Sequence, residues 1–388
     1  RRTNSHDGGR SFADRRGGPE PFGRALPCDS REDRFGYARR NDRNPHALAP
    51  SAFPLKRPAV RRVAVRCSLS LSALLLLACS SPIAQETPYL WIGRGPDAFV
   101  AATPAAERRT DMEILFATDR EELPPRGASA EFGTERSAVS RYGVATVALE
   151  PFTDWNALVE ATTTLGTTGG LAPVVRDKRI VARLGLGAED DDYAGDLFAP
   201  TASFLAREVE SRRALAECFA ERLARAERKD VYIYVHGFNT DFDTSVADFA
   251  RLWHFMGRPG VALLYAWPAR RGFFGYPHDR ESAEFTVRHL KNVLGWVAER
   301  PGVGSINIVA HSLGAGVVAT ALREIHLRDS APPPIVAAGA APAVAVTSKI
   351  GSVALAAPDI DIQVFEERWV RERAYEAARR TAIYSNPA

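Results

Sequence analysis

Residues 305–318 read Ser-Ile-Asn-Ile-Val-Ala-His-Ser-Leu-Gly-Ala-Gly-Val-Val. The first half is a short apolar run with β-branched residues, and the second half continues at helical spacing through Leu322. A serine flanked by small residues, Ser312, separates the two halves. The pattern predicts a strand, a sharp turn and a helix, with the Ser312 hydroxyl at the apex of the turn.

This turn has the composition of a nucleophile elbow, in which a strained backbone holds the serine Oγ clear of the sheet. Because the strand and the helix then pass close together, the residues two before and two after the serine must be small. Here they are Ala310 and Gly314, so the string A-H-S-L-G differs from G-x-S-x-G by one methyl group. The helix would direct its first free N–H groups, including that of Leu313, at the site. Such a string also occurs by chance at a buried helix start, and the surrounding sequence decides between the two interpretations.

Strands and helices alternate on both sides of Ser312. Helices are expected at residues 203–228, 243–257, 280–299, from the serine to about 327, and at 363–380. Strands are expected at 113–118, 142–149, 231–235, 261–267, 305–310, 353–357 and 381–384, with another inside 176–185. Residues 123–127 should break the first strand, and 151–200 should be mostly irregular, with a Thr/Gly run at 162–170 and a solvated acidic loop at 189–192. Near-continuous apolar strands between helices predict a doubly wound, mostly parallel α/β fold.

The positive charge of the chain is concentrated at its amino end. Residues 1–66 hold 16 Lys and Arg against 7 Asp and Glu, whereas the remaining residues hold 34 against 40. No nucleic-acid partner is therefore expected for the folded body. Residues 1–59 are rich in Arg, Gly and Pro without apolar periodicity, so they should be disordered. They are either untranslated, with a start near residue 60, or a basic tail that binds an acidic surface.

Residues 60–78 have the form of an export signal. Arginines at 61, 62 and 66 precede an 11-residue apolar run at 68–78, which is too short to span a bilayer. Leu76-Leu77-Ala78-Cys79 resembles the lipobox of bacterial lipoproteins. The resemblance implies lipidation of Cys79, membrane attachment through that lipid anchor and, with Ser80, an outer-membrane lipoprotein facing the periplasm. An ordinary signal peptide is the alternative. Residues 79–110 would then form a tether before a domain at 111–388.

Cysteine and histidine usage excludes several kinds of site. Of the four cysteines, only Cys218 would be left free in a mature protein that begins at Cys79, so no internal disulfide is expected. Cys218 lies in a helical pattern and is expected in the core. No Cys/His cluster has the spacing of a zinc site, and we expect no metal and no other cofactor.

Candidate site residues follow the expected strands, because ligands in such sheets bind beyond the carboxyl ends of the strands. The turn at 236–239 offers the N–H of Phe238 as a second oxyanion donor beside that of Leu313. The candidate pocket residues are His236, Asn239, Trp267, Tyr276 and His311. Packing within the turns is the simpler interpretation of both histidines. Asp279 is most simply the cap of a helix that begins at residue 280.

Residues from about 112 to 388 resemble the α/β-hydrolase superfamily and, more narrowly, an uncharacterised bacterial family within it. The shared motifs are V-H-G-F-N at 235–239, W-P at 267–268, Y-x-x-D-R-E-S at 276–282, A-H-S-L-G at 310–314 and L-A-A-P-D-I-D at 355–361. F-A-T-D-R at 116–120 is similar to the family's F-A-T-N-R. The resemblance implies a serine hydrolase of esterase or lipase type. Ser312 would form an acyl-enzyme with a small-molecule or lipid ester.

The chain departs from this family in its acid and base. A triad requires a histidine and an orienting carboxylate, but the only histidine after Ser312 is His326, expected on the surface of a helix. Asp359 and Asp361 are acid candidates, and helix capping explains them equally well. The family's acid follows the last expected strand, so we expect this domain to be incomplete at its carboxyl end, with acid and base beyond Ala388. The alternative function is a non-catalytic α/β-hydrolase-like module that binds a lipid or a partner at the cell envelope.

Overall fold

The computed structural model describes residues 89–164, 171–185, 200–331 and 344–385 of the 388-residue chain. Several predictions fall outside these residues: the basic segment at 1–59, the signal at 60–78, Cys79, and the acidic loop at 189–192. The first part of the expected tether, residues 79–88, also lies outside them.

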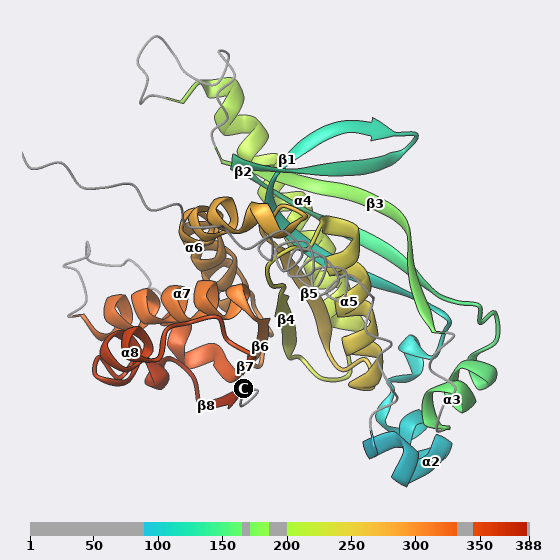
Figure 1. Ribbon diagram of the computed structural model, residues 1–388. Helices are drawn as coiled ribbons and strands as arrows, with labels where there is room; N and C mark the ends of the chain where they lie inside the picture. The colour runs from blue at the N-terminus through green and yellow to red at the C-terminus, as the bar shows by residue number, and fades with distance from the viewer. Residues whose placement is uncertain (1–88, 165–170, 186–199, 332–343, 386–388) are drawn as a thin grey trace, which may run out of the picture. The chain divides into compact units, whose positions relative to one another are not determined.

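In the described residues, eight strands form one sheet in the order β3-β2-β1-β5-β4-β6-β7-β8 (Figure 1). The pairs β1–β2 and β2–β3 are antiparallel, and all other neighbours are parallel. The strands are β1 Asp111–Arg126, β2 Ser129–Glu150, β3 Ala172–Leu184, β4 Val231–Val235, β5 Val261–Ala266, β6 Ile306–His311, β7 Ile350–Ala356 and β8 Arg380–Tyr384. The predicted doubly wound, mostly parallel fold is confirmed.

Helices cover both faces of the sheet. The α-helices of the described residues are α2 Tyr89–Ala102, α3 Trp155–Thr163, α4 Ala202–Arg225, α5 Phe242–Phe255, α6 Tyr276–Ala298, α7 Leu313–Ser330 and α8 Ile362–Phe365. In β1, Leu115 and Ala117 pack in one core with α4, α6 and α7, whereas Ile114 and Phe116 pack in a second core with α3 and α5. Burial on both faces explains why the central strands are apolar throughout. Cys218 of α4 is half-buried at the edge of the first core rather than within it.

The first two strands are much longer than expected. Instead of breaking at residues 123–127, β1 continues to Arg126 and pairs with β2 across a tight turn, so the two strands form an extended hairpin. Pairing with β5 ends at Thr118. Beyond that point the hairpin projects from the sheet (Figure 1), and the exposed Pro124 and Pro125 have no β5 ladder to interrupt.

Residues 151–200 are more regular than predicted. Asp154 caps α3 by accepting a hydrogen bond of 2.9 Å from the amide of Ala157. Thr162 and Thr163, expected in a flexible run, are buried in this helix, while residues 165–170 of that run lie outside the described ranges. The strand predicted within 176–185 is β3, which begins at Ala172.

The single helix predicted at 363–380 is wrong. The chain forms only the four-residue α8, a π-helical turn at Glu366–Val370 and a 3-10 turn at Ala374–Ala377. Arg373 has a φ of 57°, which ends helical geometry there. Trp369 is buried and its Nε1 donates to the carbonyl oxygen of Ala319 at 2.9 Å, so this irregular segment is fixed against α7.

The expected tether is already structured from residue 89 onward. Helix α2 bends at Gly95, before Pro96, and buries Trp91 and Phe99 in a small core with Val159 and Phe255. Residues 89–102, which were expected to belong to a tether, are therefore packed against the domain. Within the described residues, no helix combines the length and the apolar character needed to cross a membrane.

Candidate active site

Ser312 lies between β6 and α7 with φ 51° and ψ −124°, a strained conformation that matches a nucleophile elbow. A Cβ on Gly314 would stand 2.2 Å from the carbonyl oxygen of His236, so glycine is required two residues after the serine. Two residues before it, the methyl group of Ala310 is fully buried in the core. The close backbone contact is made by Gly314, on the helix side of the turn. The strand side can therefore accommodate the methyl group of Ala310 in place of a glycine hydrogen.

Two backbone amides flank Ser312. Leu313 is the first residue of α7, so its N–H precedes the first intrahelical hydrogen bond and is free to bind another acceptor. The turn after β4 passes directly over the serine, because a Cβ on Gly237 would lie 2.9 Å from Ser312 Cβ. The next amide, that of Phe238, makes no hydrogen bond within the described residues. The two predicted oxyanion donors thus belong to the two backbone segments that meet at Ser312.

His236 is completely buried beneath this turn. Its ring stacks on Trp267, with centroids 5.2 Å apart and an interplanar angle of 8°, and Trp267 Nε1 donates to the His236 carbonyl oxygen at 2.7 Å. Burial, together with the charge of Arg120, lowers the pKa of His236 to about 3, so the ring is neutral. His236 and Trp267 connect the turns after β4 and β5. Both side chains are fully buried, so neither is accessible to a ligand.

Arg120, the last residue of the F-A-T-D-R motif, binds the turns after β4 and β5. Its guanidinium donates to the carbonyl oxygens of Gly133 at 3.0 Å, Ala269 at 3.1 Å and Thr240 at 2.8 Å, and Nη2 lies 3.5 Å from His236 Nε2. The side chain is fully buried, and burial lowers its pKa to about 10, which leaves it charged at neutral pH. One cation therefore links the hairpin, the turn after β4 and the turn after β5.

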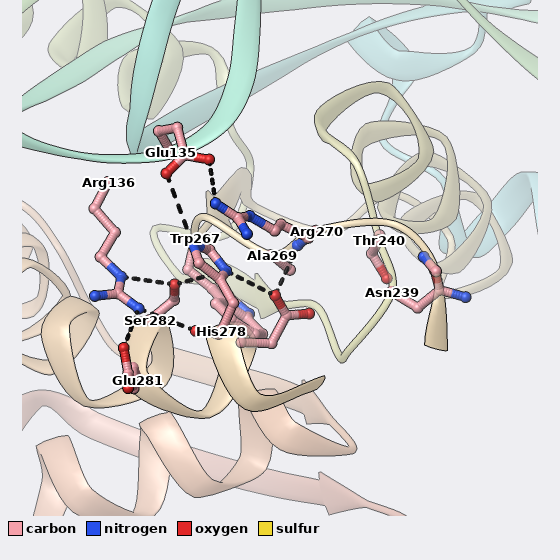
Figure 2. A network of polar contacts seen from close by, with 12 residues as sticks. Glu135, Arg136, Asn239, Thr240, Trp267, Ala269, Arg270, His278, Glu281 and Ser282 are labelled. Atoms are coloured by element: carbon pink, nitrogen blue, oxygen red, sulfur yellow. Dashed lines mark hydrogen bonds and ion pairs between the residues drawn. The ribbon is translucent and has the colours of Figure 1, made fainter. Parts of the chain in front are cut away.

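A second polar network joins the hairpin to the start of α6, as Figure 2 shows. Arg136 donates to Ser282 Oγ at 2.9 Å and to the carbonyl oxygen of His278 at 3.1 Å. Glu135 contacts Arg270 at 2.5 Å and approaches His278 Nε2 to 3.9 Å. The base of the hairpin thereby fixes the loop after β5 and the first turns of α6.

The interpretation of Asp279 as a helix cap is wrong, because α6 begins at Tyr276 and Asp279 lies inside its first turn. Asp279 is fully buried, and its Oδ1 accepts a hydrogen bond of 2.8 Å from the amide of Arg270. The carboxylate therefore anchors the loop after β5 instead of the helix end. Asn239 has a comparable role on the other side of this loop, since its Oδ1 accepts from the amide of Gly272 at 2.6 Å.

Tyr276 connects two candidate residues. Its ring lies edge-on to Phe238, with centroids 5.3 Å apart, and its hydroxyl donates to Asp359 Oδ2 at 2.8 Å. The amide of Asp359 donates to the carbonyl oxygen of Ser312 at 3.2 Å. Asp359 is therefore adjacent to the elbow. Asp361 instead caps α8, and its Oδ1 accepts from two amides at 2.9 and 3.0 Å.

No imidazole in the described residues is hydrogen-bonded to Ser312 Oγ. His311 is exposed beside the turn, and His278 contacts Asp279 and Ser282 instead. His326 lies 14 residues along α7, which places it about 20 Å from the serine. The described residues thus place the predicted nucleophile near the two predicted oxyanion donors, and none of their imidazoles is hydrogen-bonded to its hydroxyl.

Sequence reasoning located the turns of this site but missed the side chains that hold them. Arg120 and Asp279 each belong to a motif, yet nothing local indicates that both reach the turn after β5. Arg136 and Glu135 carry no motif at all.

Residues 211–387 match the model of a family described as "Alpha/beta hydrolase of unknown function (DUF900)". No curated protein is significantly similar to the chain. The match covers the strands from β4 to β8 together with the serine turn. With the eight-stranded sheet and its helices on both faces, it identifies this chain as one that contains an α/β-hydrolase domain.

Proposed function

We propose that the protein is a serine hydrolase of esterase or lipase type that acts on a small-molecule or lipid ester through an acyl-enzyme at Ser312. The observation that carries the proposal is the strained turn of Ser312 between the amides of Leu313 and Phe238. Strain of this kind costs about 1–3 kcal/mol, persists only where surrounding contacts enforce it, and is most common at functional sites.

In the proposed reaction, Ser312 Oγ attacks the ester carbonyl carbon and transfers its proton to a general base. The carbonyl oxygen becomes an oxyanion that accepts hydrogen bonds from Leu313 and Phe238, beside the positive end of the 18-residue helix α7. The intermediate collapses, the alcohol leaves with the proton from the base, and water then releases the acid from Ser312. Losing one oxyanion donor typically lowers turnover by about 10²–10³.

Labelling of the full-length protein, including any residues that follow Ala388, with a fluorophosphonate tests this proposal directly. Ser312 Oγ should displace fluoride from phosphorus, and mass spectrometry should locate the adduct on the peptide that contains Ser312. The Ser312→Ala variant is the control and should remain unlabelled while folding normally. If well-folded protein is not labelled, the proposal fails.

A non-catalytic binding module is the second candidate, because the described residues place no base beside Ser312. Hydrolysis of short 4-nitrophenyl esters separates the two functions. A serine hydrolase should lose its turnover in Ser312→Ala, whereas a binding module has no turnover to lose. Turnover that survives this substitution would place the activity elsewhere.

We also propose that the protein is exported and anchored by a lipid on Cys79, on the basis of the lipobox-like sequence at 76–79. Expression in a Gram-negative host with an alkyne-tagged fatty acid should label the protein and place it in the outer-membrane fraction. Cys79→Ser should abolish the label. Export of unlabelled protein would favour the ordinary signal peptide.

A further inference from the structure

A cavity of about 150 Å³ lies next to the elbow and is lined by residues of α6, α7 and the irregular segment that begins with α8. Leu313, whose amide is one of the two oxyanion donors, forms part of its wall. Asp359, whose amide binds the Ser312 carbonyl oxygen, forms another part. The cavity therefore begins one residue from the nucleophile and continues along α7 as far as Arg323.

Apolar side chains form part of the wall of this cavity, beside charged ones. Val317 faces it from α7, and Ile360, Phe365 and Trp369 face it from the irregular segment. Trp369 is 3% exposed, and its hydrogen bond to α7 fixes the ring in place.

Two of the charged groups that line the cavity have other partners. Arg323 at the deep end is bound by Glu372 through two contacts of 2.5 and 2.8 Å. Asp359 accepts from Tyr276. These two charges are therefore paired outside the cavity, and the apolar side chains leave a surface that an apolar chain can contact.

We propose that this cavity binds the acyl chain of the ester substrate, an inference that rests on the serine-hydrolase function proposed above. The acyl chain stays attached to Ser312 after the alcohol has left, so it is the part of the substrate that an enclosed site must hold. A cavity of about 150 Å³ accommodates a molecule of roughly six carbons. The preferred substrates are therefore esters of short-chain acids, with about four to six carbons.

Gly316 sets the width of the cavity near its entrance. A Cβ at this position would meet nothing closer than Ile360 Cγ1 at 3.8 Å and the Asp359 carbonyl oxygen at 4.0 Å, so the glycine leaves open space. A leucine there would occupy that space without touching the elbow backbone. Thr320 lies four residues further along α7 and lines the same cavity, which places it about 6 Å deeper.

The experiment measures how fast 4-nitrophenyl alkylphosphonates of increasing chain length label Ser312. In this reaction Ser312 Oγ forms a bond to phosphorus, 4-nitrophenolate leaves, and the serine proton passes to the base or to water. The labelling rate should rise about fourfold for each methylene buried, from methyl to about hexyl, and then stop rising.

Two variants and a matched control locate the effect. In Gly316→Leu the butylphosphonate should no longer label Ser312 faster than the methylphosphonate. In Thr320→Leu the butylphosphonate should still label faster than the methylphosphonate, but the hexylphosphonate should no longer label faster than the butylphosphonate. Gly295→Leu should keep the parental chain-length profile, because a Cβ added at this glycine of α6 would have no other atom within 4 Å. Thermal unfolding shows whether each variant is folded. If Gly316→Leu does not fold, the chain-length profile of Thr320→Leu decides the test.

The outcomes separate the two proposals. If Ser312 is labelled at rates that do not depend on chain length, or if the profile of both folded cavity variants equals that of the parent, the acyl-chain inference is overturned and the serine hydrolase stands. If no phosphonate of any length labels folded protein, the proposed function is overturned and the acyl-chain inference with it.

Discussion

Gly314 and His236 meet backbone to backbone, since a Cβ on Gly314 would lie 2.2 Å from the His236 carbonyl oxygen. This contact joins the helix that follows Ser312 to the strand end that carries the Phe238 amide. The separation of the proposed nucleophile and its oxyanion donor is therefore set by backbone atoms, without an intervening side chain.

Gly314→Ala should destabilise the protein by about 3 kcal/mol, because the new methyl group forces α7 away from β4. Fluorophosphonate labelling of the remaining folded protein should also slow. Gly316→Ala is the matched control, two residues along the same helix, and its Cβ has room. It should raise stability by about 0.5–1 kcal/mol, as alanine does inside a helix. Urea denaturation gives both values, and equal effects of the two substitutions would contradict the close-contact argument.

Arg120→Lys should slow labelling of Ser312 by about tenfold to a hundredfold, since one ammonium group does not replace a guanidinium that binds two turns. Arg258 offers a matched control. It is also fully buried, and it donates to the carbonyl oxygens of Glu107 and Arg109 and to the ring of His254, at the opposite ends of the strands.

Arg258→Lys should lower the free energy of unfolding by about 2 kcal/mol, as Arg120→Lys does, but should leave the labelling rate of folded protein unchanged. Rates are compared well below the unfolding temperature of each variant. Equal slowing in both variants would mean that Arg120 contributes to stability alone.

Asp119 should make the protein less stable as the pH rises from about 4 to about 7. Its carboxyl is fully buried 3.3 Å from the hydroxyl of Tyr265, and burial raises its pKa to about 7. The unfolded chain releases this proton near pH 4. The folded state therefore holds one more proton in this window, and the resulting loss of stability is on the order of 4 kcal/mol.

Asp119→Asn should remove this slope and make the variant more stable than the parent at pH 8. Buried His236 acts in the opposite direction below about pH 6.5, because its lowered pKa favours the neutral ring in the folded state. That contribution is present in both proteins and cancels in their difference. Urea midpoints from pH 5 to 8 give this difference, and a constant value would show that Asp119 does not titrate in the window.

Asp361 should behave as a helix cap. Asp361→Ala should cost about 1 kcal/mol, whereas Asp361→Asn, which keeps an oxygen acceptor for the amides of α8, should cost little. Neither should change the labelling rate of Ser312. If asparagine preserved stability but slowed labelling as much as alanine, Asp361 would be acting through its charge.

The central strands and the serine turn could be predicted from sequence because their signals are local. Every residue of β5 is buried, so its apolar run stands out, and the requirement for glycine at 314 follows from the turn itself. The hairpin of β1 and β2 was missed because two adjacent prolines normally end a strand, whereas here they lie beyond the pairing with β5. The broken segment after α8 was missed because its apolar residues pack irregularly around Trp369.

Within the site, the missed contacts connect segments far apart in the sequence. Arg120 reaches Thr240 and Ala269, and Tyr276 reaches Asp359, more than 80 residues away in each case. No spacing or periodicity encodes such pairs. Sequence motifs located where the turns are, and the tertiary structure was needed to show what holds them.

The φ of Ser312 has a thermodynamic consequence for the whole domain. A conformation that only glycine adopts freely is held there by surrounding contacts, which offset about 1–3 kcal/mol of strain. Replacing the serine by glycine would release this energy, so Ser312→Gly should withstand higher temperature than the parent protein. The backbone conformation that the proposed reaction requires at position 312 is thus one that lowers the thermal stability of the domain.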